Sequence, residues 1–180
     1  GKGRAGRTWL ASPENTMCFS MAYPFKRSPS ELTGLSLAVG ITVIAGLAQA
    51  IGISQEKLHQ AGLRLKWPND LLLNNSKLAG ILIEGGQTKV GDPSWMIVGV
   101  GINLHNASAI EKELDQSGLK VGALDQLLPI NTKLPDAECI WLELLNSFDE
   151  HFKKFDQFGF SAYQQELSLI HISEPTRPII

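Results

Sequence analysis

Three glycines and three cationic side chains share the first seven residues of the 180-residue chain. The cations are Lys2, Arg4 and Arg7, and the glycines satisfy the pattern G-x-G-x-x-G. Glycine lets backbone N–H groups approach an anion closely, and arginine makes bidentate contacts to phosphate or carboxylate. The segment therefore predicts a loop that encloses a polyanion. A solvated basic loop and a nucleic-acid contact are the alternatives.

Two common phosphate-binding motifs do not fit this opening segment. A dinucleotide fingerprint needs a helix that begins at its third glycine, and Pro13 with its neighbours disfavours a helix there. A Walker A loop needs a closing Gly-Lys-Ser/Thr, which is absent from the segment.

The second candidate stretch, K-W-P-N-D, ends with Pro68, Asn69 and Asp70. These three residues form a strong turn signal at the end of a predicted strand, where active-site groups commonly lie. They are equally typical of a turn that only ends a strand. Both interpretations stay open for this stretch by itself.

Two predicted strands combine glycines with one polar residue each. Lys77 opens an otherwise apolar strand that contains Gly80, and the strand V-G-V-G-I-N carries Gly99 and Gly101 on one face before Asn103. Glycine weakens a strand and often marks the close approach of a ligand or another backbone. The pattern favours a flat ligand that lies across these strands.

Together, in order and spacing, the four stretches resemble the catalytic domain of biotin–protein ligases, whose motifs are G-R-G-R-x-G-R-x-W, K-W-P-N-D, K-L-A-G-I-L-x-E and G-x-G-I-N. The resemblance covers about residues 1–166. It implies the α+β fold of the class II synthetase-like biotin/lipoate ligase catalytic domain. One departure is Lys2, where the family usually has arginine; lysine keeps the charge but lacks the bidentate fork.

The resemblance implies an ATP-dependent ligase that acts in two steps. Biotin and ATP would form biotinyl-5′-AMP and pyrophosphate, with Mg²⁺ as the metal cofactor. The biotinyl group would then pass to one lysine of a biotin carboxyl carrier protein or domain of a biotin-dependent carboxylase. Catalysis of the first step is mainly positioning and charge neutralisation, because the biotin carboxylate and the phosphate repel each other.

The resemblance also implies residue roles. Lys77 would bridge the biotin carboxylate and the α-phosphate, while Arg4 and Arg7 would fold over the adenylate and exclude water. Asp70 would orient or deprotonate the incoming lysine. The biotin-binding residues would be Lys2, Gly3, Arg4, Lys77, Gly80 and Gly99. The residues that bind ATP or the adenylate would be Arg7, Trp9, Asn69, Asp70 and Asn103, with Trp9 over the adenine.

Some of these residues have a plain structural alternative. Trp9 could be a core aromatic at the loop exit, Asn103 a strand cap and Lys2 a solvated side chain. No spacing indicates a metal ligand set or a catalytic histidine; this applies to His59, His105 and His151.

The hydrophobic pattern places strands before a run of helices, which predicts an α+β domain with a mixed sheet and helices packed mainly on one side. Strands are expected over residues 16–23, 63–67, 71–73, 77–84 and 95–102. Helices are expected over residues 31–51, 108–117, 121–128 and 135–156. Ser30 is the expected N-cap of the first helix, whose glycines would be explained by close packing against the sheet.

Composition is typical of a globular, cytoplasmic protein. The chain is 43% hydrophobic and 19% charged, and its formal net charge of −2 gives no general affinity for nucleic acid. Cys18 and Cys139 lie far apart and favour a reducing compartment. The apolar residues 35–53 contain glycines and Gln49, so a buried helix is favoured over a membrane span.

The two ends of the chain carry their own expectations. Residues 167–180 resemble the translation of a sequencing adapter, so a non-native tail is expected there and His171 receives no role. The resemblance implies that a strand and helix before the opening loop, and a small C-terminal β-barrel domain, are missing. We therefore expect the fragment to be weakly active.

Two other functions compete with biotin ligation. A lipoate–protein ligase would adenylate a different acid by the same chemistry, and a nucleic-acid-binding module would use only the opening cations. The resemblance allows a homodimer, gives no reason to expect a membrane partner, and allows DNA binding only through an N-terminal helix-turn-helix that this chain lacks.

Overall fold

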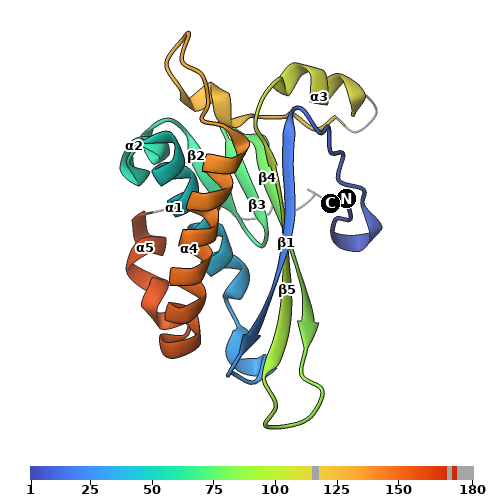
Figure 1. Cartoon of the computed structure of the whole chain (residues 1–180), viewed down its shortest axis with the longest axis vertical. Helices are drawn as coiled ribbons and strands as arrows, with labels where there is room; N and C mark the ends of the chain where they lie inside the picture. The colour runs from blue at the N-terminus through green and yellow to red at the C-terminus, as the bar shows by residue number, and fades with distance from the viewer. Residues whose placement is uncertain (115–117, 170–171, 174–180) are drawn as a thin grey trace, which may run out of the picture.

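The computed structural model describes residues 1–114, 118–169 and 172–173. It shows a β-sheet with helices on one side (Figure 1), as predicted. The strands are β1 (Thr16–Phe25), β2 (Leu63–Lys66), β3 (Asp70–Leu73), β4 (Ser76–Gly86), β5 (Ser94–Asn103) and β6 (Ile172–Ser173). The helices are α1 (Leu35–Ile51), α2 (Gln55–Gln60), α3 (Ala107–Glu113), α4 (Ala137–Phe158) and α5 (Gln164–Leu169).

The sheet has the order β1-β5-β4-β3-β2-β6. All pairs among β1 to β5 are antiparallel, and β6 joins β2 in parallel. The sheet is therefore mixed, as predicted, only through this two-residue strand. The order brings β3, β4 and β5 side by side, and these strands carry three of the four sequence stretches that could do chemistry.

Helices α1 and α4 cover one face of the sheet (Figure 1). Alternate side chains of β1 point toward them, so Phe19 makes edge contacts with Trp141 and Phe148 of α4, at ring-centroid distances of 4.7 and 5.9 Å. Val100 of β5 and Ile81 of β4 are buried on the same side. Burial of these apolar side chains places the hydrophobic core between the sheet and the two helices.

The glycines of α1 allow close packing on both of its sides. A Cβ atom at Gly40 would lie 2.5 Å from Cδ1 of Leu65 on β2. A Cβ atom at Gly46 would lie 3.1 Å from Cα of Leu144 on α4. The prediction that packing explains these glycines is confirmed, with the second one serving the neighbouring helix and not the sheet.

Two polar clusters hold the end of α4. Arg27 Nε donates hydrogen bonds to the carbonyl oxygens of Phe155 (3.0 Å) and Asp156 (2.9 Å) in the last turn of the helix, where the Phe155 oxygen also accepts the N–H of Gly159 (2.8 Å). The buried Tyr163 hydroxyl donates to the carbonyl oxygen of His151 (3.0 Å) and lies 3.1 Å from its Nδ1. Burial lowers the pKa of His151 and raises that of Tyr163, so both side chains are neutral at pH 7.

The opposite side of the sheet, called the open face below, carries small or exposed residues. Cys18, Ser20 and Ala22 of β1 are exposed, and Trp95 and Ile97 of β5 are 54% and 51% exposed. The N-terminal segment lies on this side of β1, away from α1 and α4 (Figure 1). The same strands therefore present a packed surface on one side and an accessible surface on the other.

The first predicted helix, over residues 31–51, begins too early. Gly34 adopts a left-handed conformation (φ 84°) and separates α1 from a 3₁₀ turn at Pro29–Leu32. Ser28, and not Ser30, precedes that turn, and its hydroxyl donates a 2.8 Å hydrogen bond to Glu31 Oε1. The predicted N-cap was wrong because Pro29 at the first position of the turn sets its start one residue after Ser28.

The helix predicted over residues 121–128 is wrong. Only the 3₁₀ turn Leu124–Leu127 forms there, and Val121 makes an isolated parallel bridge with Lys77. The backbone N–H of Gly122 donates to the carbonyl oxygen of Lys77 (2.9 Å), so pairing with β4 uses the groups that a helix would need.

The remaining helix predictions hold with shifted ends. Helices α3 and α4 correspond to the predictions over residues 108–117 and 135–156, of which residues 115–117 lie outside the described part. The short α2 was not predicted. None of the helices described by the structure is long and apolar enough to cross a membrane.

The predicted tail is described only in part. Helix α5 continues to Leu169, and β6 pairs with β2. Residues 170–171 and 174–180, with His171 among them, lie outside the described residues. The expected domain boundary at residue 166 therefore stays a prediction.

Candidate active site on the open face

An irregular register between β3 and β4 brings two charged residues to the open face. Asp70 is the Cα partner of Gly80, and Leu72 is the partner of Lys77, with a shift between Leu71 and Leu72. A β-bulge of this kind re-aims a side chain. Lys77 and Gly80 therefore face the same side although they are three positions apart in the strand.

Lys77 and Asp70 form an ion pair at the centre of the site. Lys77 Nζ lies 3.0 Å from Asp70 Oδ1, with the side chains 30% and 24% exposed. The ammonium group also lies 5.3 Å from the centroid of the Trp9 ring, within cation–π range. Because both side chains are mostly buried, this pair is screened less than a surface pair. It supplies a positioned positive charge beside the sheet.

Two glycines of neighbouring strands form the floor on which the Trp9 indole lies; we call this space the glycine slot. A Cβ atom at Gly101 would lie 2.5 Å from Cε2 of Trp9, and one at Gly80 would lie 3.0 Å from Cζ3. Only glycine allows this approach. A flat group therefore lies where the sequence predicted a flat ligand, and it is an indole of the same chain. At Gly99 the nearest atom, Ser20 Oγ, would be an ordinary 3.6 Å away.

The opening loop, residues 1–9, is a hairpin on the open face. Lys2 and Thr8 form an isolated antiparallel bridge, and the N–H of Gly3 donates to the carbonyl oxygen of Arg7 at 2.6 Å. The turn uses positive φ angles at Ala5 (54°) and Gly6 (72°), and alanine is disfavoured there. The loop is thus shaped by its own backbone bonds.

The three loop cations have different surroundings. Lys2 Nζ makes a 3.0 Å ion pair with Glu84 Oε1, and the side chains are 70% and 53% exposed. Arg4 Nη1 donates a long, 3.4 Å hydrogen bond to Asn69 Oδ1. Arg7 is exposed, and its guanidinium makes no hydrogen bond or ion pair with the part of the chain that the structure describes. Glu84 received no role in the sequence analysis, although it ends the third motif.

The two asparagines hold backbone in place. Asn69 Nδ2 donates to the carbonyl oxygen of Ile81 (2.8 Å), and the Ile81 N–H donates back to the Asn69 carbonyl (2.8 Å). Asn103 is 3% exposed, and its Nδ2 donates to the carbonyl oxygen of Lys77 at 3.0 Å. Asn103 therefore fixes the start of β4, and with it the backbone position of Lys77.

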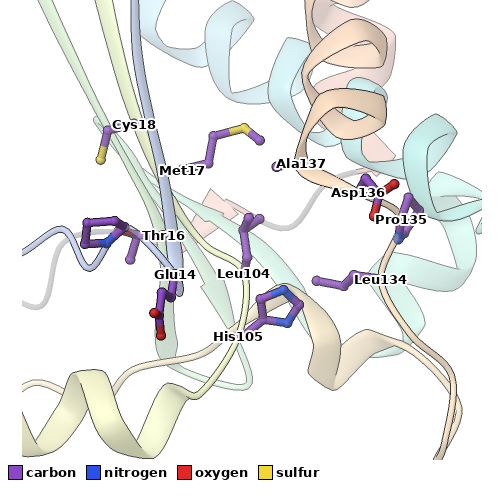
Figure 2. Close-up of a pocket in the computed structure, with 11 residues that line it drawn as sticks. Glu14, Thr16, Met17, Cys18, Leu104, His105, Leu134, Pro135, Asp136 and Ala137 are labelled. Atoms are coloured by element: carbon purple, nitrogen blue, oxygen red, sulfur yellow. The ribbon is translucent and has the colours of Figure 1, made fainter.

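Of two cavities, only the smaller adjoins the site. A small one of about 130 Å³ lies beside the loop contact and is lined by Arg4, Ser36, Pro68, Asn69, Ile81, Leu82 and Ile83. A larger one of about 420 Å³ lies between the start of β1 and the beginning of α4 (Figure 2). Its lining includes Glu14, Met17, His105 and Asp136 but none of the predicted site residues. The larger cavity is therefore not where the predicted chemistry lies.

The remaining titratable groups supply no further nucleophile or metal ligand set among the described residues. Burial raises the pKa of the Cys18 thiol, so it is a poor nucleophile at pH 7. His105 lies 3.8 Å from Asp125, and His151 belongs to the buried cluster under α4. Among the described residues, no group of three or more His, Cys, Asp or Glu side chains could hold a metal ion.

The assembled site has the chemistry of an anion-binding platform. Its cations come from two separate parts of the chain, Lys77 from β4 and Lys2, Arg4 and Arg7 from the opening loop. Between them lies a glycine floor that accepts a planar ring. Such an arrangement can neutralise charge that develops on a phosphate or carboxylate next to a flat group.

Comparison with known proteins decides the family. The sequence model of the Biotin/lipoate A/B protein ligase family matches residues 1–103, which contain the opening loop and β1 to β5. The chain belongs to this family. The resemblance to biotin–protein ligases seen in the four sequence motifs is thereby confirmed.

Relatives within the ligase family are identical to this chain at about a third of the aligned positions. The bifunctional ligase/repressor BirA of Escherichia coli is 30% identical over 182 residues, which cover 100% of this chain and 52% of BirA. The biotin–[acetyl-CoA-carboxylase] ligase of Mycobacterium tuberculosis is 32% identical over 150 residues, covering 83% and 49%. The chain thus spans about half the length of the curated relatives it matches.

The fold is that of the biotin protein ligase catalytic domain. The biotin protein ligase of Aquifex aeolicus, solved in complex with biotin and ATP, superposes with a TM-score of 0.68 at 29% identity. The superposition covers 94% of this chain and 64% of that protein. The predicted α+β fold class is confirmed.

Proposed function

We propose that this chain is the catalytic domain of an ATP-dependent biotin–protein ligase. It activates biotin as biotinyl-5′-AMP and transfers the biotinyl group to a lysine of a biotin carboxyl carrier protein. The single observation that carries this proposal is the Lys77–Asp70 pair beside the glycine slot, because it supplies a fixed cation next to a planar site. Family membership and the relatives named for biotin ligation support it.

In the first step, an oxygen of the biotin carboxylate attacks the α-phosphorus of ATP, and the bond to pyrophosphate breaks. Two anions must approach each other, so cations lower the barrier. Lys77 is placed to bridge the carboxylate and the α-phosphate. Its position on β4, held by Asn103 through the backbone, supports this role.

The opening loop would enclose the reactive adenylate. Arg4 and Arg7 would contact phosphate oxygens and keep water out, and Lys2 and Gly3 would contact biotin. Arg7 is exposed, so its guanidinium is available for such a contact. Gly80 and Gly99 leave room for biotin on the open face.

The nucleotide would be held by groups near the strand ends. We expect Trp9 to cover the adenine and Asn69 and Asn103 to help place the phosphates. Mg²⁺ would arrive on the phosphates of ATP, because Asp70 and Glu84, the carboxylates near the slot, are each paired with a lysine. No step proposed here depends on a protein ligand to the metal.

In the second step, the carrier lysine attacks the carbonyl carbon of the adenylate and AMP leaves. The amine must lose its proton, and Asp70 is the carboxylate nearest to the predicted reacting groups. When the adenylate phosphate takes over the contact with Lys77, the Asp70 carboxylate is released to accept that proton. One ion pair thus serves both steps.

Pyrophosphate release with biotin, lipoate or neither acid tests this function directly. We expect pyrophosphate release with biotin and ATP. We also expect transfer of the biotinyl group to a carrier domain, which mass spectrometry of the carrier detects. Release with lipoate but not biotin would assign the chain to lipoate ligation instead. Single-turnover conditions with excess chain are used, so that one round of adenylation is detected.

The nucleic-acid alternative has a separate readout. Salt-sensitive binding to DNA or RNA that is lost in Arg4→Ala and Arg7→Ala, without any adenylation, would contradict the proposal. Adenylation that is reduced by the same two substitutions would support it.

A further inference from the structure

The glycine slot is occupied by a side chain of the chain itself. The Trp9 indole contacts both strand glycines so closely that a single added Cβ at Gly101 would overlap it at 2.5 Å. Lys77 Nζ lies 5.3 Å from the centroid of the same ring. The opening loop therefore places a planar aromatic group where a planar ligand beside Lys77 must bind.

The indole is an imperfect occupant. Its Nε1 is buried and makes no hydrogen bond of good geometry among the described residues, and the side chain that it approaches is the Cys18 thiol, a weak acceptor. Buried donors are normally paired, and an unpaired one costs free energy that is regained when the group returns to water or meets an acceptor. The slot therefore holds Trp9 mainly by shape and by the Lys77 contact, with only a weak polar contact to the Cys18 thiol.

The contacts that hold the loop over the slot are weak. The Lys2–Glu84 ion pair is exposed on both sides, and the Arg4–Asn69 hydrogen bond is 3.4 Å long. Exposed ion pairs contribute little, and hydrogen bonds of this length are poor. The loop can therefore leave the open face without breaking buried structure.

We propose that Trp9 is an internal plug of the glycine slot, and that biotin must displace it before it reaches Lys77. The inference rests on the proposed function, because it takes biotin as the ligand of the slot. Displacement frees the indole to cover the adenine of the adenylate. Trp9 thus competes with the first ligand and then encloses the second.

Fluorine NMR of the chain labelled with 5-fluorotryptophan tests displacement directly. The four tryptophans give separate resonances, and the one missing in Trp9→Phe belongs to Trp9. We expect biotin alone to shift the Trp9 resonance toward its position in ligand-free Gly101→Ala, where the added Cβ expels the indole. The Trp95 resonance, from an exposed residue of the same face, should stay in place.

Calorimetry of biotin binding gives the second readout. If the plug fills the slot most of the time, Trp9→Ala should bind biotin about 5- to 10-fold more tightly, because the competent fraction rises. A non-hydrolysable biotinyl-adenylate analogue should gain less, since the variant also loses the adenine cover. Trp95→Ala is the matched control and should bind biotin as the unmodified chain does.

The outcomes separate the plug from the proposed function. Biotin binding that leaves the Trp9 resonance unmoved, or that is equal or weaker in Trp9→Ala, overturns the plug and leaves biotin ligation standing. Failure of both the unmodified chain and Trp9→Ala to bind biotin overturns the proposed function and this inference with it. Binding by Trp9→Ala alone supports both.

Discussion

The two faces of the sheet use alternate residues of the same strands for different purposes. On β1, Phe19 points to the covered face and packs on α4, whereas its neighbours Cys18 and Ser20 point to the open face and are exposed. On β5, Val100 is buried in the core between Gly99 and Gly101. The covered face is made of large buried apolar side chains, whereas the open face combines small and charged residues with the exposed Trp95 and Ile97.

This difference shows how one short strand can serve stability and chemistry at once. The period of two in a strand separates the two tasks by a single residue. Substitutions on the covered face should therefore change the free energy of unfolding, and substitutions on the open face should change activity. The four predictions below test that separation, from the largest expected effect to the smallest.

Phe148→Ala should lower the free energy of unfolding by about 3–5 kcal/mol, because it opens a cavity in the covered face. Phe148 is 1% exposed, and its ring lies 5.1 Å from that of Phe152. Urea unfolding followed by circular dichroism measures the loss. Adenylation per folded molecule should be unchanged; a large fall there would show that the two faces are coupled.

Lys77→Ala should reduce the rate of adenylate formation about 10²- to 10³-fold, because it removes the cation that meets the developing charge. The free energy of unfolding should fall by less than in Phe148→Ala, because both partners of the pair keep part of their surface in water. Pyrophosphate release gives the rate.

The matched control is Lys153→Ala, which removes the exposed ion pair between Lys153 and Asp149 on the surface of α4. Lys153→Ala should leave the rate of adenylate formation and the free energy of unfolding nearly unchanged. Equal losses of rate in the two variants would contradict the assignment of Lys77 to the site.

Acidification should destabilise the covered side through His151. Burial lowers the pKa of this residue below its value of 6.5 in an unfolded chain, so folding favours the neutral form. Its contribution is complete above pH 6.5 and is lost as the pH falls through the lower, folded value. Urea unfolding should give a lower free energy of unfolding at pH 5.5 than at pH 7.5, and the difference should be smaller than the loss caused by Phe148→Ala.

His151→Gln should flatten this pH dependence, and His105→Gln, on the exposed surface, should retain it. At the alkaline end, the raised pKa of Tyr163 predicts the opposite sign. Its contribution is present below pH 10 and is lost as the pH rises above that value. A flat profile from pH 7.5 to 5.5 in the unmodified chain would contradict the role of His151.

Ala5→Gly should stabilise the opening hairpin by about 0.5–1 kcal/mol, because glycine adopts the positive φ angle at little cost. Amide exchange of Gly3, whose N–H donates across the hairpin, should slow about two- to fivefold. Ala5→Val should speed it. Global unfolding should not respond, because the loop lies outside the core.

Several parts of this architecture follow from local sequence rules. Alternating apolar residues predicted the strands, and the helical repeat predicted α4 almost to its ends. The predictions failed where a neighbour intervened. Gly34 delays α1, and pairing with Lys77 keeps Val121 out of a helix. Tertiary pairing of this kind leaves no local pattern to detect.

The candidate site divides in the same way. The motifs pointed to Lys77, Asp70 and the loop cations, and the structure brings Lys77 and Asp70 to 3.0 Å. It also adds Glu84 as the partner of Lys2, which no motif rule had assigned. The roles in binding and catalysis stay predictions.

By itself, the sequence determined the fold class, the family and the residues from which the site is built, because residue type and period are local properties. Only the tertiary structure decided which of these residues meet. The bulge that turns Lys77 toward Asp70 depends on the register of two neighbouring strands. The position of Trp9 on Gly80 and Gly101 depends on contacts between segments more than 60 residues apart in the sequence. Such contacts arise from packing, which no single stretch of sequence specifies.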